Sequence, residues 1–398
     1  HQRRLKNLKE KARTLTCAIM SLLLISILAT LFPTATAEQI NRNEVVIVSS
    51  DWGAPVGWNA LLSRPAYFTN LMYPSLYIYS PYVDKWIPYL AKNYTWVDKY
   101  TLLVTIKDEA KWWDGQPITA EDVKYSLELG KRYSVPMYTP QWDYIENVTV
   151  LGDPATSKVV VFYLNVTTLN YFSALNVLWQ PLIIPKHRWQ TLETLYGTAL
   201  TTEFRDDNPA AIVGGGPYKP YSLTTEAIYF VRYDDWWGKD IFGIPTVKYL
   251  VHKDFISNPN AVLAFKAGDL DVMTHMTPEI WKIWEAEGLD RRTYYPTPPY
   301  YVAQGPVVLN INYKKKGLDN PTVRRAVAYA LPIADMVSGP YYNYSVSCVP
   351  VPIIHTGPAA TYINQSLIDQ YGWTYNITKA NEILDNAGIV DTDADGFR

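Results

Sequence analysis

Aromatic and amide side chains in the segment 49–62 have the chemistry of a binding site. Trp52, Trp58 and Asn59 lie in this segment, just after a predicted strand, and ligands of open α/β lobes lie where strands end. The apolar faces of a sugar ring stack on indoles and bury area worth about 25 cal/mol per Å², whereas each buried hydroxyl without a partner costs about 1–3 kcal/mol. We therefore expect contacts to a flat, hydroxyl-rich ligand, although each tryptophan could equally pack in a core. Further candidates for the walls of this site are Tyr73, Trp179, Tyr301, Gln304 and Asn312.

Three aspartates near the end of the sequence have the spacing of metal ligands. Asp391, Asp393 and Asp395 alternate along the chain, and Gly396 supplies a sharp turn after them. This pattern is typical of a calcium loop, although the closing acid of such a loop would fall beyond Arg398. Two interpretations stay open, a structural calcium site and a solvated aspartate-rich turn.

Motifs for common catalytic chemistries are absent from the sequence. The glycine run 214–216 lacks the Lys-Ser/Thr of a phosphate loop, and neither a Gly-x-Ser-x-Gly elbow nor a His-Glu-x-x-His pair occurs. The five histidines are scattered, and Cys17 and Cys348 are the only cysteines, so a zinc centre and a disulfide scaffold are disfavoured. We expect a binding protein without a cofactor, apart from the calcium alternative. A pair of glycosidase carboxylates stays open, because sequence singles out no pair.

Helices and strands that would position these residues alternate along the chain. Runs of β-branched residues predict strands at 44–49, 159–164, 227–232, 247–252 and 307–311. Capping residues, prolines and glycines predict helices at 119–130, 258–268, 277–284, 320–331 and 378–388. This mixture without an internal repeat predicts an α/β or α+β architecture of several lobes, with the glycine run 214–216 as a crossover or hinge between them.

Composition and the N-terminal segment point to export. The 398 residues fit two or three domains, and the net charge of −2 disfavours a protein that coats nucleic acid. A basic stretch, a long apolar run and Ala35-Thr36-Ala37 predict a signal peptide over 1–37, with an uncleaved membrane anchor as the alternative. We expect an extracellular or periplasmic location. Asn-x-Ser/Thr sites, which could carry glycans in an exported chain, occur at Asn93, Asn147, Asn165, Asn343, Asn364 and Asn376.

A signature at residues 112–123 carries a resemblance to a known family. From Trp112 to Val123 the chain reads W-x-D-G-x-P-x-T-A-x-D-V, which resembles the family 5 extracellular solute-binding proteins, the peptide, nickel and oligosaccharide receptors of ABC importers. Further blocks that resemble the family follow in order at 181–187, 213–218, 261–272, 309–312 and 320–331. The segment from Trp52 to Asn59 is also similar to the W-x-x-P-x-x-x-N start of the cello-oligosaccharide-binding branch.

This resemblance implies an α/β, two-lobed, periplasmic-binding-protein-like fold with an extra subdomain on the first lobe. Lobe I would comprise 38–60 and 205–295, the extra subdomain 61–204, and 296–398 the start of lobe II, whose C-terminal part this sequence is expected to lack. In this layout most signature residues are fold determinants. Asp114 and Gly115 would form a turn, Thr119 would cap a helix, and Arg324 or Arg325 would pack or pair on a helix surface.

The implied function is ligand capture by hinge closure for an ABC permease in the membrane, by a monomer that is not an enzyme and binds no nucleic acid. The tryptophans of the segment 49–62 favour an oligosaccharide over a peptide ligand. Two alternatives from other classes stay open, a carbohydrate-active hydrolase at the cell surface and a structural surface glycoprotein.

Overall fold

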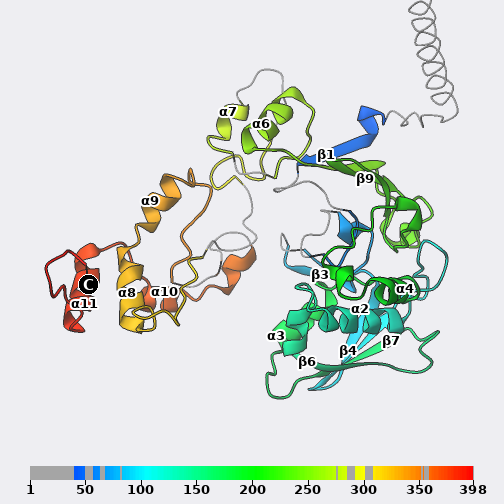
Figure 1. Ribbon diagram of the computed structural model, residues 1–398, viewed down its shortest axis with the longest axis horizontal. Helices are drawn as coiled ribbons and strands as arrows, with labels where there is room; N and C mark the ends of the chain where they lie inside the picture. Colours follow the sequence, from blue (N-terminus) through cyan, green and yellow to red (C-terminus); the bar gives the residue numbers. More distant parts are fainter. Residues whose placement is uncertain are drawn as a thin grey trace, which may run out of the picture. The chain divides into compact units, whose positions relative to one another are not determined.

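The computed structural model describes residues 40–49, 57–62, 68–80, 83–274, 277–284, 292–300, 308–350, 353 and 358–397 (Figure 1). The predicted signal peptide and its cleavage site after Ala37 lie outside these residues. The described part is mixed α/β, as the sequence predicts. Its predicted division into lobe I, extra subdomain and lobe II stays a prediction.

A four-stranded sheet combines the first strand with strands from the middle of the chain. Its order is β1 (Val45–Ser49), β10 (Tyr249–Lys253), β9 (Ala227–Arg232) and β8 (Tyr218–Leu223). The strand β9 pairs antiparallel with both of its neighbours, and Ile228 and Phe230 on it are fully buried. The helix α6 (Asn258–Ala267) follows, and it ends at Gly268, whose φ of 84° only glycine adopts readily. The short helix α5 (Lys239–Phe242) lies between β9 and β10 in the chain.

A second four-stranded sheet is antiparallel throughout. Its order is β4 (Ala91–Asp98), β5 (Thr101–Ile106), β7 (Val159–Leu164) and β6 (Ile145–Val150). The helix α2 (Ala120–Arg132) packs against β6 and β7 (Figure 1), because its buried Val123 and Leu127 share one apolar core with Val160 and Phe162. A hairpin of β2 (Tyr77–Ser80) and β3 (Lys85–Pro88) precedes the sheet, and α3 (Tyr171–Ala174) and α4 (Lys186–Tyr196) follow it.

The C-terminal segments are helical. They comprise α7 (Trp281–Trp284), α8 (Pro321–Ala330), α9 (Ile333–Ser338), α10 (Gln365–Tyr371) and α11 (Ile377–Asn386). The helices α8 and α11 pack together, and the backbone N–H of Asn376 donates to the Tyr329 carbonyl at 2.8 Å. A small apolar cluster of Ile280, Ile283, Tyr300 and Tyr344 lies between segments of this region.

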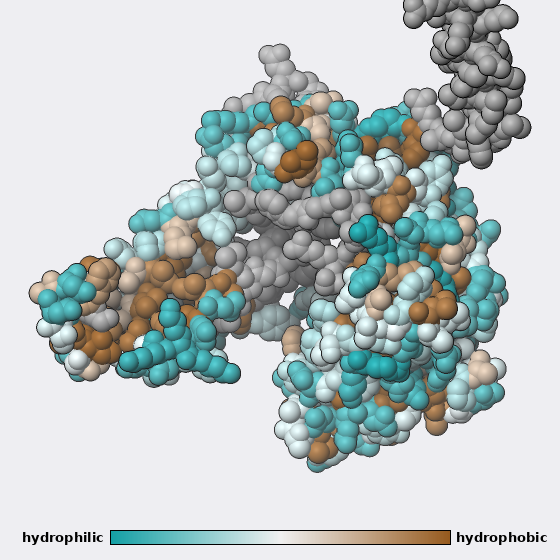
Figure 2. Space-filling model, in the orientation of Figure 1, coloured by the Kyte–Doolittle hydropathy of each residue, from teal (hydrophilic) through white to brown (hydrophobic). Residues whose placement is uncertain are grey.

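Apolar side chains also reach the surface of the C-terminal helices. Figure 2 shows apolar surface gathered over this part of the chain, and Met336, Leu367 and Ile377 are among its exposed residues. In the part of the chain that the structure describes, no helix is both long and apolar enough to cross a membrane.

A buried carboxylate joins the signature block to the block at 181–187. Asp122 accepts hydrogen bonds from the backbone N–H of Thr119 (2.8 Å) and from that of Lys186 (2.9 Å), and the indole of Trp112 donates to it at 3.4 Å. One turn along α2, the Ser126 hydroxyl accepts the N–H of Ile184 at 2.9 Å. The start of α2 is therefore fixed to the start of α4 by buried polar contacts, which stabilise because every donor has a partner.

The remaining signature residues have the predicted fold roles. The Asp114 carboxylate accepts the backbone N–H of Gln116 at 3.1 Å, and Gly115 adopts a φ of 88°, so the two form a turn. The Arg324 guanidinium donates to the carbonyls of Leu318 and Asp319, on the turn before α8.

The glycine run 214–216 is packed tightly, which corrects its prediction as a hinge. The N–H groups of Gly215 and Gly216 both donate to the Met72 carbonyl, at 2.9 and 2.8 Å. A Cβ at Gly216 would lie 1.9 Å from the Leu71 carbonyl oxygen, so no other residue fits without moving the backbone. The glycines therefore allow a close approach of two chain segments.

Most predicted elements are confirmed with small shifts, whereas the helix predicted at 277–284 forms only over its last four residues, α7. The strands β7 and β9 have the predicted bounds, β10 begins two residues later than predicted, and α11 begins at Ile377 because Asn376 caps it. The predicted strand at 307–311 is wrong in its described residues, since 308–311 contain no strand.

We predict that Asp122→Ala strongly destabilises the region around α2. The change leaves buried N–H donors of Thr119 and Lys186 without an acceptor, which should lower the free energy of unfolding by roughly 2–4 kcal/mol. Urea unfolding followed by circular dichroism measures this. Asp143 is exposed, so Asp143→Ala should change the urea midpoint of unfolding little. Equal losses of unfolding free energy in the two variants would contradict the stabilising role of the Asp122 carboxylate.

Candidate functional site

The described residues form a groove of about 1310 Å³. Four stretches of chain supply all but one of the lining residues: the region around β2, the turn after α2, the segment that carries α3, and the segment that follows β9; the other is Pro217, just before β8. The lining residues are Leu62, Thr69, Asn70, Leu71, Ser75, Tyr77, Ile78, Tyr79, Tyr89, Val135, Pro136, Met137, Pro140, Gln141, Tyr144, Ser173, Asn176, Trp179, Gln180, Leu182, Pro217, Trp236, Phe242, Gly243, Ile244 and Pro245.

None of these lining residues carries a charge. Their polar groups are amides and hydroxyls, and their rings are those of four tyrosines, two tryptophans and a phenylalanine. Apolar and aromatic walls with a few polar groups are typical of small-molecule sites. The groove is therefore suited to a neutral ligand with both apolar faces and hydrogen-bonding groups.

One set of rings in the groove is centred on Tyr79. Its ring lies 5.8 Å from that of Trp179 and 5.5 Å from that of Trp86, centroid to centroid. The Trp179 indole N–H donates to the Asn176 side chain at 3.1 Å, and the Tyr79 hydroxyl donates to Asp84 at 2.8 Å. These bonds fix the orientations of the two rings, one from Asn176 within the lining and one from Asp84 in the turn between β2 and β3.

A second set of rings surrounds Trp236. Its ring stacks on Phe242, with centroids 5.7 Å apart and planes at 20°, and lies 6.2 Å from the ring of Tyr89. The Trp236 indole N–H donates to the Gly215 carbonyl at 3.1 Å. Behind these rings the Lys107 ammonium donates to the Tyr89 carbonyl at 2.6 Å, and burial lowers the pKa of this lysine.

Two glutamine side chains meet in the wall of the groove. The side-chain amide of Gln141 lies 2.6 Å from that of Gln180, as one N–H···O hydrogen bond. Gln141 is 2 % exposed, and both residues line the groove.

Three predicted ligand contacts lie in the core, which corrects their assignment. Trp58 is fully buried with its ring edge-on to Phe230, and Tyr73 is fully buried with its ring edge-on to Trp189. The Asn59 amide N–H₂ donates to the carbonyls of Leu200 and Phe204, at 2.8 and 2.6 Å, and its oxygen accepts the N–H of Leu61. Asn59 thus ties the segment 57–62 to the segment 200–206, and none of the three side chains presents surface to a ligand.

The other predicted contacts have different outcomes. Trp179 lines the groove, and its role as a ligand contact stays a prediction. Asn312 is exposed in a turn, where it accepts the N–H of Lys314 at 3.1 Å, and it does not line the groove. Trp52, Tyr301 and Gln304 lie outside the described residues.

Sequence reasoning missed most residues of the groove. Tyr79, Gln141, Gln180 and Trp236 come from four separated stretches and share no motif. One signal was available, because the pair Trp236-Trp237 begins four residues after the end of a predicted strand, and ligands of α/β lobes lie where strands end.

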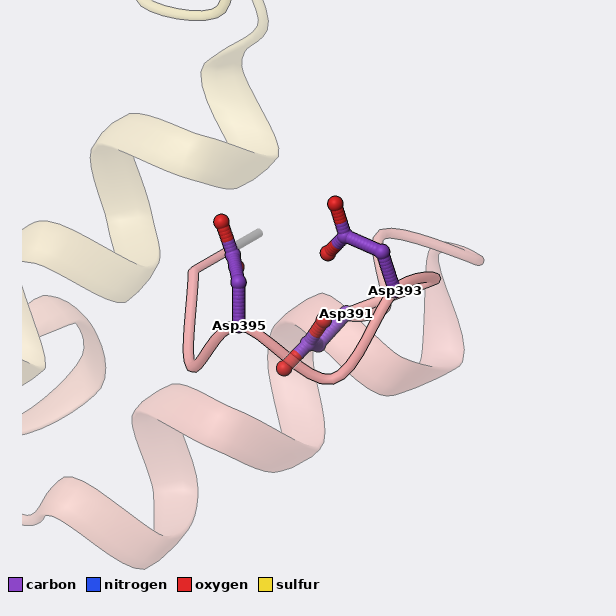
Figure 3. Close-up of side chains that lie close together, drawn as sticks. All are labelled: Asp391, Asp393 and Asp395. Carbon is purple, nitrogen blue, oxygen red and sulfur yellow. The ribbon is translucent and has the colours of Figure 1, made fainter.

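The aspartate-rich loop brings its three carboxylates together. Figure 3 shows Asp391, Asp393 and Asp395 on one loop after α11, and one oxygen of each lies within 4.8 Å of the others. The Asp391 carboxylate accepts the N–H of Gly396 at 2.8 Å, and such backbone bonds lower the pKa of Asp391. Carboxylate oxygens could hold a hard cation here, and a structural calcium ion stays a prediction.

The six predicted glycan acceptors are all described by the structure, and none of them is buried. Asn93 and Asn147 lie on the two edge strands of the second sheet, and Asn364 and Asn376 cap helices. Their glycosylation stays a prediction.

Comparison with known proteins identifies the family. The family described as bacterial extracellular solute-binding proteins, family 5 Middle, matches residues 85–398. The chain belongs to this family. The resemblance read from the signature block is therefore confirmed, although nothing singles out the cello-oligosaccharide-binding branch.

Solved structures of this family share the fold of the chain. An oligopeptide ABC transporter, periplasmic oligopeptide-binding protein from Thermotoga maritima is 28% identical, with a TM-score of 0.78, over 90% of this chain and 65% of that one. A structure of the same protein with mannohexaose bound gives a TM-score of 0.75 at 28% identity, over the same shares of the two chains. The predicted periplasmic-binding-protein-like α/β fold is thereby confirmed.

Curated relatives match over a smaller share. The probable peptide-binding protein YejA of Agrobacterium fabrum is 26% identical over 58% of this chain and 37% of its own length. A probable ABC transporter-binding protein of Deinococcus radiodurans is 31% identical over 50% of this chain and 34% of its own length. The chain thus spans about a third of the length of these curated relatives.

We predict that stability falls steeply above pH 10, in part through the tyrosines of the groove. Burial raises the pKa of Tyr77 and of Tyr79 to about 12, and the hydrogen bond to Asp84 adds to the rise for Tyr79. An unfolded tyrosine ionises near pH 10. Between about pH 10 and 12 the folded chain therefore binds more protons than the unfolded chain, so stability falls as pH rises.

Melting temperatures measured from pH 9 to 11.5 test this. Tyr79→Phe should show a shallower decline than the parent, whereas Tyr371→Phe, at an exposed ring, should keep the parental slope. A parental slope in Tyr79→Phe would contradict the raised pKa of this tyrosine.

Proposed function

We propose that the chain is the substrate-binding protein of an ABC importer and captures neutral oligosaccharides in the groove. The observation that carries the proposal is the lining, in which rings and amides meet without a charged side chain. Membership of a family of extracellular solute-binding proteins supports a binding role outside the cytoplasm and a permease as partner. Capture then works by population shift, because a ligand favours whichever form of the protein it binds more tightly.

An uncharged lining discriminates between the two ligand classes. A peptide with free ends brings an ammonium and a carboxylate, and a charge taken from water without a partner costs several kcal/mol. A neutral sugar brings hydroxyls, which amides and hydroxyls of the wall can satisfy, and C–H faces, which stack on rings such as Trp179. The Thermotoga maritima structure with mannohexaose supports the same assignment.

An oligopeptide is the second candidate ligand. The Thermotoga maritima protein and YejA are named as peptide-binding. A peptide could use the same amides for its backbone, with its charged ends outside the described part of the groove. Isothermal titration of the parent chain with mannohexaose, cellohexaose and unblocked tetrapeptides separates the candidates. Saturable binding by peptides alone would overturn the sugar assignment.

We predict that Trp179→Ala weakens mannohexaose binding tenfold or more. The indole offers a stacking face, and tenfold in Kd corresponds to about 1.4 kcal/mol, the size of one lost ring contact. Phe172→Ala is the matched control, since Phe172 is 79% exposed in the same segment and does not line the groove. An unchanged Kd in Trp179→Ala would remove this residue from the site.

We also predict that affinity for a neutral hexasaccharide is flat between pH 5 and 9. The lining holds no Asp, Glu, His, Lys, Arg or Cys, and the pKa of its Tyr77 and Tyr79 is raised to about 12. Titrations at constant ionic strength measure this. A tenfold change across the range would show that a charged group outside the lining takes part in binding.

A further inference from the structure

The pair Gln141 and Gln180 is held in place by backbone on both sides. Gln141 lies in a turn at Thr139–Asp143, where its N–H donates to the Tyr138 carbonyl and its carbonyl accepts the N–H of Tyr144. Gln180 follows Trp179 directly, and its N–H donates to the Asn176 carbonyl at 3.0 Å. The two side chains meet at 2.6 Å.

The pair leaves one amide carbonyl and one NH₂ group without a side-chain bond within the described residues. A side-chain amide has a carbonyl with two acceptor positions and an NH₂ with two donors, and each of these two amides makes a single side-chain bond, to the other. In the orientation seen, the Gln141 Oε1 acceptor and the Gln180 Nε2 donor are left over. Turning both amides around exchanges these roles and still leaves one acceptor and one donor.

We propose that the Gln141–Gln180 pair determines the specificity of the groove by forming hydrogen bonds with two neighbouring hydroxyls of a sugar ring. This inference rests on the proposed function. One hydroxyl donates to the free carbonyl while its neighbour accepts from the free NH₂, so the pair matches a diol. Stacking of a C–H face on Trp179 is available to every pyranose and does not discriminate between sugars. The positions of the hydroxyls differ between sugars, so the amides that bond these hydroxyls select among sugars. A site built to bond a hydroxyl strongly rejects an analogue that lacks it or misplaces it.

The burial of Gln141 and the position of Gln180 beside Trp179 favour hydrogen bonding of the pair to a sugar. Gln141 is almost fully buried and lines the groove, so a ligand or water in the groove is the partner within reach of its remaining acceptor. Gln180 is next to Trp179 in the chain, and both line the groove. A ring stacked on the indole therefore brings its hydroxyl edge near the amides.

Methionine substitutions test the pair, because methionine keeps the side-chain length and removes the amide. The parent, Gln141→Met, Gln180→Met and the double variant are titrated with mannohexaose and with cellohexaose, whose sugars differ in the direction of one hydroxyl. Gln190→Met is the matched control, since Gln190 is exposed on α4 and outside the groove. Melting temperatures are measured for all variants.

We expect each single variant to lose mannohexaose affinity tenfold or more. The double variant should lose about as much as one single variant, because the two amides act as a unit. The ratio of the two hexasaccharide affinities should move towards one, which a merely structural role would not produce. Gln190→Met should keep the parental constants.

The outcomes separate this inference from the function on which it rests. Parental affinities and an unchanged ratio in Gln180→Met and Gln141→Met, alongside weakened binding in Trp179→Ala, would overturn the role of the pair and leave the proposed function standing. Absence of saturable binding of either hexasaccharide to the parent would overturn both. If Gln141→Met lowers the melting temperature strongly, the hexasaccharide affinities of Gln180→Met decide the role of the pair, because Gln180 is only half-buried.

Discussion

The groove depends on the buried carboxylate of Asp122. It binds the start of α2 to the N–H of Lys186 at the start of α4. The stretch after α2 leads to Gln141, and the stretch before α4 carries Trp179 and Gln180. A second tie, from the Tyr138 hydroxyl to the Leu182 carbonyl at 2.6 Å, lies between them. Two walls that are distant in sequence are thus fixed to one another by polar contacts in an apolar core, where such contacts are strong and their loss is costly.

Charged side chains contact residues of the lining, but no lining residue is itself charged. Lys107 donates to the backbone carbonyl of Tyr89, and Asp84 accepts from the Tyr79 hydroxyl, while neither charged residue belongs to the lining. Further away, the buried pair of Arg188 and Asp206 holds the segment that carries α4 to the segment 200–206. Fixed rings and amides lose little conformational freedom when a ligand binds, which favours affinity.

The sequence predicts much of the fold and little of the site. The blocks around Asp114, Thr119 and Asp122 indicate the family because they build turns and caps, which local sequence encodes. Trp58 and Tyr73, which the sequence predicts as ligand contacts, are core residues. Residue type alone does not distinguish an aromatic side chain that packs in a core from one that contacts a ligand. Burial is decided by tertiary neighbours such as Phe230 and Trp189. The groove draws on four separated stretches, so no local pattern could bring Gln141 and Gln180 together.

The close contact at the glycine run has a consequence for how the molecule moves. The backbone at 214–216 is bonded to Met72 and covered by the indoles of Trp113, Trp236 and Trp237, each of which donates to a glycine carbonyl. Torsional freedom that glycine would otherwise bring is lost under this cover. We therefore expect bending that accompanies ligand capture to occur at other joints of the chain, while the stretch 214–216 stays fixed against Met72.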